Sequence, residues 1–167
     1  MRNIIAIATF LLFPVTAFAG GHAEFGGHGT AVRSDMKTIE ATSGKHVQVT
    51  TSDLWMYDNP PEGFPTAQKS NCNYFQAFAT GQQQPIGGVG TCQAQDPDGD
   101  ISLWNGIFQP NGTIAVTVIA GTGKWAALVG AKFQGKTRQA MDGASIYDFS
   151  PENKRAIYHK HLEFICL

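Results

Sequence analysis

The stretch between residues 111 and 135 limits most strongly what this chain can fold into. It contains two apolar runs, Thr113–Ala120 and Trp125–Phe133, which are bounded by glycine. Apolar runs of this length that include β-branched residues predict buried strands rather than helices. The link between them, Gly121-Thr122-Gly123-Lys124, predicts a tight antiparallel hairpin, because glycine reaches the positive φ angles that such turns need.

Further short runs predict six more strands, and no segment predicts a long helix. The predicted strands are Lys45–Tyr57, Asn73–Thr80, Gly87–Gln95, Ile101–Phe108, Ala144–Phe149 and Arg155–Leu167. Evenly spaced short strands with glycine-rich turns indicate an all-β fold. The sequence therefore predicts a single antiparallel eight-stranded barrel, with a β-sandwich as the alternative.

The first 19 residues are typical of a secretory signal peptide. Arg2 precedes the apolar stretch Ile4–Phe13, and Ala17-Phe18-Ala19 forms a small-x-small cleavage site. The apolar stretch is too short for a good membrane span, and no second one follows. We therefore expect cleavage after Ala19 and a periplasmic or secreted protein.

The mature chain is predicted to consist of a flexible, Gly- and His-rich segment over residues 20–43 and a barrel domain over residues 44–167. Cleavage after Ala19 would leave Gly20-Gly21-His22 at the new terminus. An amine, two amides and the His22 imidazole provide the planar nitrogens that Cu²⁺ favours. The alternative is an accidental copper affinity.

Three cysteines, Cys72, Cys92 and Cys166, leave one without an intramolecular partner. Cys72 and Cys92 begin and end a predicted pair of neighbouring strands, so a disulfide between them is expected in an exported protein. Small buried thiols are the alternative. A net charge of −1 with 15% charged residues argues against nucleic acid as a partner.

Two groups of residues predict possible metal sites. His159, His161 and Glu163 share one face of the predicted last strand and could bind Zn²⁺ or Cu²⁺, with His46 as a further ligand. The alternatives are a solvent-exposed polar face and a polar interior in which the imidazoles meet an organic ligand. The acidic stretch Asp96–Asp100 could bind Ca²⁺, but Pro97 and Asp98-Gly99 favour a plain hairpin turn.

Aromatic residues form the candidate binding site for an organic ligand. An eight-stranded barrel can hold one small molecule or fill its interior with side chains. The candidates for lining such a cavity are Trp55, Tyr57, Tyr74, Trp104, Trp125 and Tyr147. Packing in a structural core is the alternative. No nucleophile elbow, phosphate-binding loop or dinucleotide fingerprint is present in the sequence.

The stretch Gly121-Thr122-Gly123-Lys124-Trp125, with Gly130 and Phe133 downstream, resembles the "GGTGKF…G" signature of dirigent proteins. It is also similar to the matching hairpin of allene oxide cyclases. Both families are small eight-stranded barrels, so the resemblance favours the barrel over the sandwich and implies a possible homo-oligomer. Ala120 replaces the first glycine of the signature, and no catalytic residue of either family aligns with this chain.

Three functions follow from these patterns. The first is an exported barrel that binds a small apolar organic molecule in its interior. The second is a cyclase, isomerase or coupling-guiding enzyme, as the resemblance implies; such an enzyme works by orienting a reactive intermediate. The third is a copper- or zinc-binding protein. The first two need no cofactor.

Overall fold

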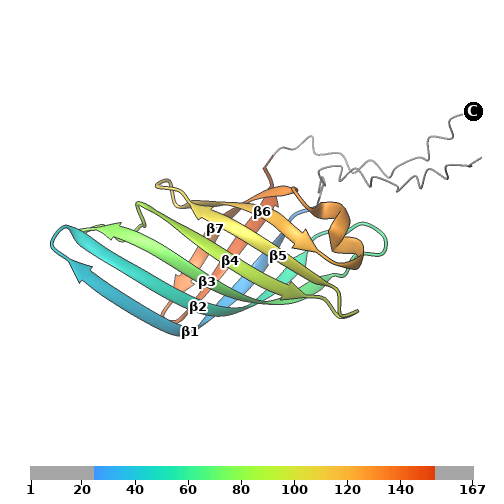
Figure 1. Ribbon diagram of the computed structural model, residues 1–167, viewed down its shortest axis with the longest axis horizontal. Coiled ribbons are helices and arrows are strands. Elements are labelled where there is room, and N and C mark those ends of the chain that lie inside the picture. Colours follow the sequence, from blue (N-terminus) through green and yellow to red (C-terminus); the bar gives the residue numbers. More distant parts are fainter. Residues whose placement is uncertain (1–24, 153–167) are drawn as a thin grey trace, which may run out of the picture.

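The computed structural model describes residues 25–152, and in it eight antiparallel strands close into one barrel (Figure 1). The elements are β1 (Gly27–Ala41), β2 (Gly44–Tyr57), β3 (Ala67–Ala79), β4 (Gly87–Gln95), β5 (Ile101–Phe108), β6 (Thr113–Gly121), η1 (Gly123–Leu128), β7 (Lys132–Met141) and β8 (Ala144–Pro151). Each strand pairs with the next in sequence, and β8 pairs with β1. The predicted all-β, eight-stranded antiparallel barrel is confirmed.

Strand β1 corrects the prediction of a flexible segment over residues 20–43, which is wrong for residues 27–41. This strand pairs with β2 along its length and with β8 through Gly27–Val32. Its inward residues are small, and a bulge between Arg33 and Asp35 shifts the alternation, so no apolar period is visible. The signal peptide and the predicted strand Arg155–Leu167 lie outside the described residues.

The predicted tight hairpin at Gly121–Lys124 is also wrong. The chain instead forms the 3₁₀ helix η1, and β7 begins only at Lys132. Trp125 and Leu128, three residues apart, are both fully buried in η1. The apolar spacing in this run therefore belongs to one face of a helical turn rather than to a strand.

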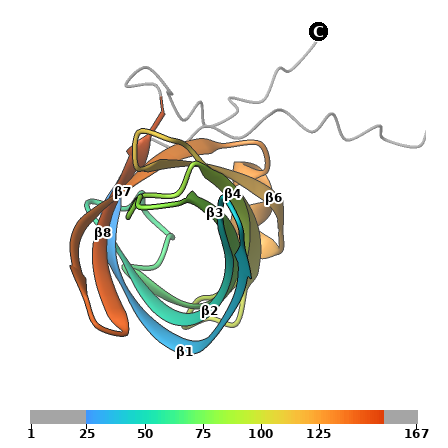
Figure 2. The same ribbon diagram turned by 90° about the vertical axis from the view of Figure 1, so that its left-hand side faces the viewer.

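The two ends of the barrel differ. The turns that follow β1, β3, β5 and β7 gather at one end, here called the turn end, and Figure 2 looks at the ring of strands from that side. The opposite, loop end carries η1 and the long link between β2 and β3. Aromatic rings fill the loop end: Phe25 and Tyr57 lie with centroids 5.2 Å apart, and Phe64 and Trp125 5.3 Å apart.

A disulfide joins β3 and β4 inside the barrel. Cys72 lies directly opposite Cys92 in the strand register, and their sulfur atoms are 2.03 Å apart. The predicted pairing is confirmed. The bond closes a loop with a sequence separation of 20 residues, for which the chain-entropy model predicts a stabilisation of about 3 kcal/mol. Over residues 25–152, no helix is long and apolar enough to cross a membrane.

Candidate functional site

A buried carboxylate lies on the interior face of the barrel wall. Successive side chains of a strand point to opposite faces, and along β2 this places Thr51, Asp53 and Trp55 inside the barrel with the disulfide. Asp53 is 5% exposed and Thr51 6% exposed. Asp53 is therefore an ionisable group within a largely apolar core.

The two carboxylate oxygens of Asp53 have different surroundings. Oδ2 accepts hydrogen bonds from the Tyr147 hydroxyl at 2.9 Å and from Trp55 Nε1 at 3.4 Å. Oδ1 is buried and has no hydrogen-bond partner among the described residues, and the same holds for the neighbouring Thr51 hydroxyl. A buried polar atom without a partner is destabilising by about 1–3 kcal/mol, so two of them together indicate a place for a ligand.

Burial raises the pKa of Asp53 above its ordinary value, because the charged form loses hydration. Hydroxyls and an indole N–H around the carboxylate oppose that rise: the Thr51 hydroxyl lies close enough to contribute, although no hydrogen bond of ordinary geometry joins it to Asp53. Burial and the charge of Asp53 also raise the pKa of Tyr147 and of Tyr74. Both phenols are therefore neutral hydrogen-bond donors near the carboxylate.

Two glycines make room for these tyrosines. A Cβ atom at Gly29 of β1 would collide with the Tyr147 ring, and one at Gly90 of β4 would collide with the Tyr74 ring. Each glycine therefore lets a tyrosine ring approach the backbone of the neighbouring strand closely. These close approaches explain why glycine occupies inward positions in two strands, where it has a low intrinsic preference.

An apolar cleft adjoins Asp53. It has a volume of about 60 Å³ and is open on one side; its lining consists of Trp55, Trp104, Ile114, Val116, Phe133, Gly135, Tyr147 and Phe149. Trp55 and Tyr147 line the cleft and also donate to Asp53, so these two side chains connect the cleft to the carboxylate, although Asp53 and Thr51 are not themselves lining residues. A volume of this size suits a small molecule or one end of a larger one, since drug-sized ligands occupy about 300–1,000 Å³.

A second interior polar group, nearer the loop end, is fully partnered. The Tyr57 hydroxyl donates to Gln68 Oε1 at 2.5 Å, and Gln68 Nε2 donates to Ser102 Oγ at 3.2 Å. Trp104 Nε1 also donates to Ser102 Oγ, at 2.7 Å. Because these side chains hydrogen-bond to one another, they stabilise the core and leave no unpaired polar group for a ligand.

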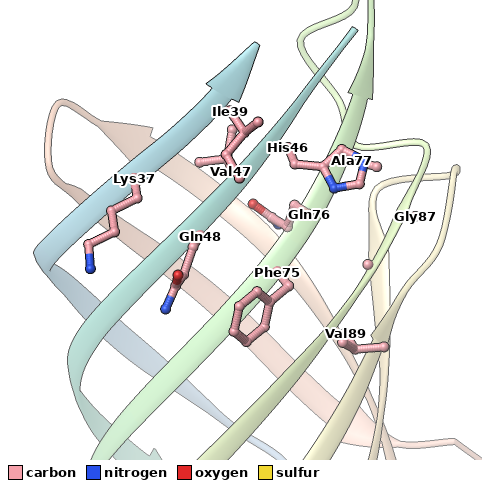
Figure 3. A pocket seen from close by; sticks show the side chains of 11 residues that line it. Lys37, Ile39, His46, Val47, Gln48, Phe75, Gln76, Ala77, Gly87 and Val89 are labelled. Carbon is pink, nitrogen blue, oxygen red and sulfur yellow. The ribbon is translucent and has the colours of Figure 1, made fainter. Parts of the chain in front are cut away.

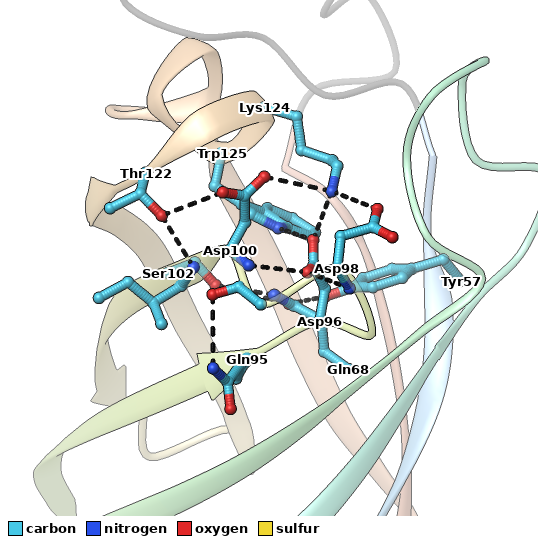
Figure 4. A network of polar contacts seen from close by, with 12 residues as sticks. Tyr57, Gln68, Gln95, Asp96, Asp98, Asp100, Ser102, Thr122, Lys124 and Trp125 are labelled. Carbon is cyan, nitrogen blue, oxygen red and sulfur yellow. Dashed lines mark hydrogen bonds and ion pairs between the residues drawn. The ribbon is translucent and has the colours of Figure 1, made fainter.

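The acidic turn holds a lysine side chain (Figure 4). Lys124 Nζ lies 2.7 Å from Asp96, 2.9 Å from Asp98 and 3.2 Å from Asp100. Asp96 Oδ1 also accepts from the backbone amides of Asp98 and Asp100, as expected for a turn. An ammonium group thus lies where the calcium alternative would place a metal ion, and the turn interpretation agrees with the structure.

The same contacts shift the pKa values of Asp96 and Lys124. Burial alone would raise the pKa of Asp96, but hydrogen bonds from Lys124 and from Trp125 Nε1 hold it below its ordinary value. The hydrogen bonds to Asp96 and Asp98 raise the pKa of Lys124. The three aspartates therefore join η1 to the β4–β5 turn as a charged cluster.

The aromatic residues predicted to bind a ligand all contribute to the interior. Trp55, Trp104 and Tyr147 line the cleft, and Tyr74 lies beside Asp53. Tyr57 and Trp125 pack in the loop-end core. The structure thus brings Trp55, Tyr74 and Tyr147 together around Asp53, with Trp104 packed against Trp55, and their role in binding stays a prediction.

The predicted metal ligands His22, His159, His161 and Glu163 lie outside the described residues, as does Cys166. His46, the further candidate, is exposed on the outer face of β2. Over residues 25–152, no three His, Cys, Asp or Glu side chains are grouped so that they could hold a metal ion.

A larger hollow lies on the outside of the barrel (Figure 3). It has a volume of about 500 Å³, and the side chains of Lys37, Gln48 and Phe75 lie on its surface across β1, β2 and β3. Phe75 is 52% exposed there. This hollow contains no buried polar atom that lacks a partner, when residues 25–152 are considered. The interior cleft is therefore the better candidate site.

Asp53 and Thr51 were missed by sequence reasoning. The signal that could have found them is their position: they share the inward phase of β2 with Val47, Val49 and Trp55. A carboxylate in the apolar phase of a strand is unusual, because buried acids are rare unless they are paired. The sequence alone does not show which tyrosines approach it from distant strands.

Comparisons with protein-family models, with curated proteins and with solved structures gave no match to this chain.

Proposed function

We propose that this barrel binds a small, largely apolar organic molecule in its interior, with a polar group of the ligand against Asp53. The cleft supplies an apolar, aromatic wall, and Asp53 Oδ1 and Thr51 Oγ1, which lie behind the lining residues Trp55 and Tyr147, supply hydrogen-bonding atoms without partners in the described part of the chain. This combination of an apolar lining with a few convergent polar groups is typical of small-molecule sites.

The observation that carries the proposal is the pair of buried polar atoms without partners. Within the described chain, every other buried side-chain nitrogen or oxygen atom has a hydrogen-bond partner. The exceptions lie near each other on β2, and Asp53 accepts hydrogen bonds from two residues that line the cleft, Trp55 and Tyr147. Native proteins satisfy most of their buried polar groups, so the two unpartnered atoms support a ligand that supplies a hydrogen-bond partner.

A cleft-filling substitution tests the proposal. Val116→Phe adds a ring to the cleft lining on β6, while Thr117→Phe adds the same ring to the outer face of the same strand. We expect saturable shifts of indole N–H signals in ¹H–¹⁵N spectra of the wild type with at least one of 1-butanol, 2-butanone and n-butylammonium chloride. Val116→Phe should weaken that binding at least tenfold, and Thr117→Phe should retain it.

Thermal unfolding of both variants serves as the control for folding. Binding by none of the three compounds up to their solubility limits would contradict the proposal. Equal binding by wild type and a folded Val116→Phe variant would also contradict it, since the ligand would then lie elsewhere.

An enzyme that acts on such a ligand is the second candidate, favoured by the Asp53–Tyr147 contact. Asp53 has a pKa raised by burial and an oxygen atom without a hydrogen-bond partner among the described residues, and positioned carboxyl groups of this kind serve as general acids or bases. A role in orienting a reactive intermediate, as in allene oxide cyclases and dirigent proteins, is consistent with this site. Kinship with those families stays a proposal from the Gly121–Trp125 stretch alone.

A further inference from the structure

The charge environment of Asp53 indicates what kind of polar group the ligand carries. The ion pairs of the described chain involve other aspartates, namely Asp58, Asp96, Asp98, Asp100, Asp142 and Asp148. Asp53, although buried, forms none of these pairs. A buried carboxylate is unfavourable without a cation or a full set of donors, so a cationic ligand would supply what the protein lacks.

The hydrogen-bonding pattern around the Asp53 carboxylate favours a ligand that donates hydrogen bonds. Oδ2 already has two donors, the Tyr147 hydroxyl and the Trp55 indole, whereas Oδ1 has none in residues 25–152. The Thr51 hydroxyl can accept a hydrogen bond as well. A primary ammonium group has three N–H donors and could satisfy both oxygen atoms at once.

The walls of the cleft also suit a cation. Trp55, Trp104, Phe133, Tyr147 and Phe149 line the cleft, and Trp55 and Tyr147 among them donate to Asp53. The faces of aromatic rings carry negative potential and attract ammonium groups, most strongly where water is excluded. A neutral alcohol would gain the apolar contacts but neither the ring attraction nor the ion pair with Asp53.

Building on the proposed interior binding function, we propose that the ligand is a primary alkylammonium compound, with its NH₃⁺ group on Asp53 Oδ1 and Thr51 Oγ1 and its alkyl chain against the aromatic wall. The open side of the cleft allows a chain longer than the cleft to extend beyond it. The positive charge distinguishes this ligand from a neutral hydroxyl or carbonyl compound of the same size.

The test compares n-butylammonium chloride with 1-butanol, which have the same number of non-hydrogen atoms. Dissociation constants are measured at pH 7 and fixed ionic strength from ¹H–¹⁵N spectra of the full-length protein. We expect n-butylammonium to bind at least tenfold more tightly than 1-butanol. Asp53→Asn, which keeps the side-chain shape, should remove most of that difference and leave the affinity for 1-butanol within about threefold.

Two further variants distinguish n-butylammonium binding at Asp53 from a general effect of the protein's negative charge. Asp35→Asn removes one negative charge at an exposed position of β1 and should leave n-butylammonium binding unchanged. Thr51→Val removes the free hydroxyl while keeping the side-chain volume, and should weaken n-butylammonium binding by a smaller factor than Asp53→Asn.

Equal affinity for n-butylammonium and 1-butanol in the wild type would overturn this inference and leave the interior-binding proposal standing. A preference for n-butylammonium that persists in Asp53→Asn, or that disappears in Asp35→Asn, would also overturn it. Failure of both compounds and of 2-butanone to bind would instead contradict the proposed function itself.

Discussion

Asp53 links the stability of the barrel to pH. Its pKa in the unfolded chain is close to the ordinary aspartate value of 3.8, and burial raises the pKa in the folded protein. Between these two values the folded state holds a proton that the unfolded state has released. The contribution of Asp53 to the free energy of unfolding is therefore fully present below about pH 4 and is lost as the pH rises through the folded pKa.

We expect the difference in unfolding free energy between wild type and Asp53→Asn to fall as the pH rises through this window. Urea unfolding at a series of pH values measures the difference. Comparison with the variant is needed because Asp96 and Asp148 have lowered pKa values and act in the opposite direction, losing stability as the pH falls. A difference that is flat or rises with pH would show that Asp53 is not a desolvated acid.

Gly90 permits the approach of Tyr74 to the interior site. A Cβ atom at Gly90 would collide with the Tyr74 ring, so Gly90→Ala should destabilise the protein by about 1–3 kcal/mol, the usual effect of overpacking. Gly87→Ala is the matched control in the same strand, since no atom lies within 4 Å of its added Cβ. Denaturant unfolding compares them, and equal effects of the two substitutions would contradict the packing described.

At the scale of elements, the ion pairs of Lys124 link η1 to the β4–β5 turn of the barrel. Lys124 Nζ contacts three aspartates of the β4–β5 turn, and the adjacent Trp125 donates to one of them. Lys124→Met should leave Asp96 buried beside an apolar chain and destabilise the protein by about 2 kcal/mol, the range for hydrogen bonds to charged groups. Lys132→Met, at an exposed position of β7, is the control and should change the stability little. Chemical denaturation measures both.

A similar loss in both lysine variants would show that the effect comes from net charge rather than from the cluster. The Lys124→Met loss should also shrink at low pH, because Asp96 then becomes protonated and no longer needs a cation. A loss that is independent of pH would contradict the account of the acidic cluster.

At the scale of the whole molecule, the sequence predicted the closed barrel because turn glycines and alternating apolar residues recur along the chain. It also predicted the Cys72–Cys92 bond, since strand neighbours are local in this topology. It failed at β1, whose inward residues are small and whose alternation is broken by a bulge. It failed at η1, where Trp125 and Leu128 produce an apolar run without a strand.

The candidate site, like the fold, could be predicted from the sequence only in part. The aromatic residues were predictable as a group, because a barrel interior must be filled or lined by large side chains. Asp53 was not, since its environment is made by residues from distant strands: Tyr147 lies 94 positions away and still donates to it. Closure of the barrel through β1 and β8 is what brings these two residues together.

The most direct test of this account is the pKa of Asp53, measured from the NMR signal of its carboxyl carbon with and without saturating n-butylammonium. Tyr74 and Tyr147 are the titratable groups that face it, and burial keeps both neutral over this range. We predict a pKa above the ordinary aspartate value in the free protein and a lower one when the ammonium is bound. An ordinary pKa in the free protein, or one that the ammonium leaves unchanged, would contradict the account.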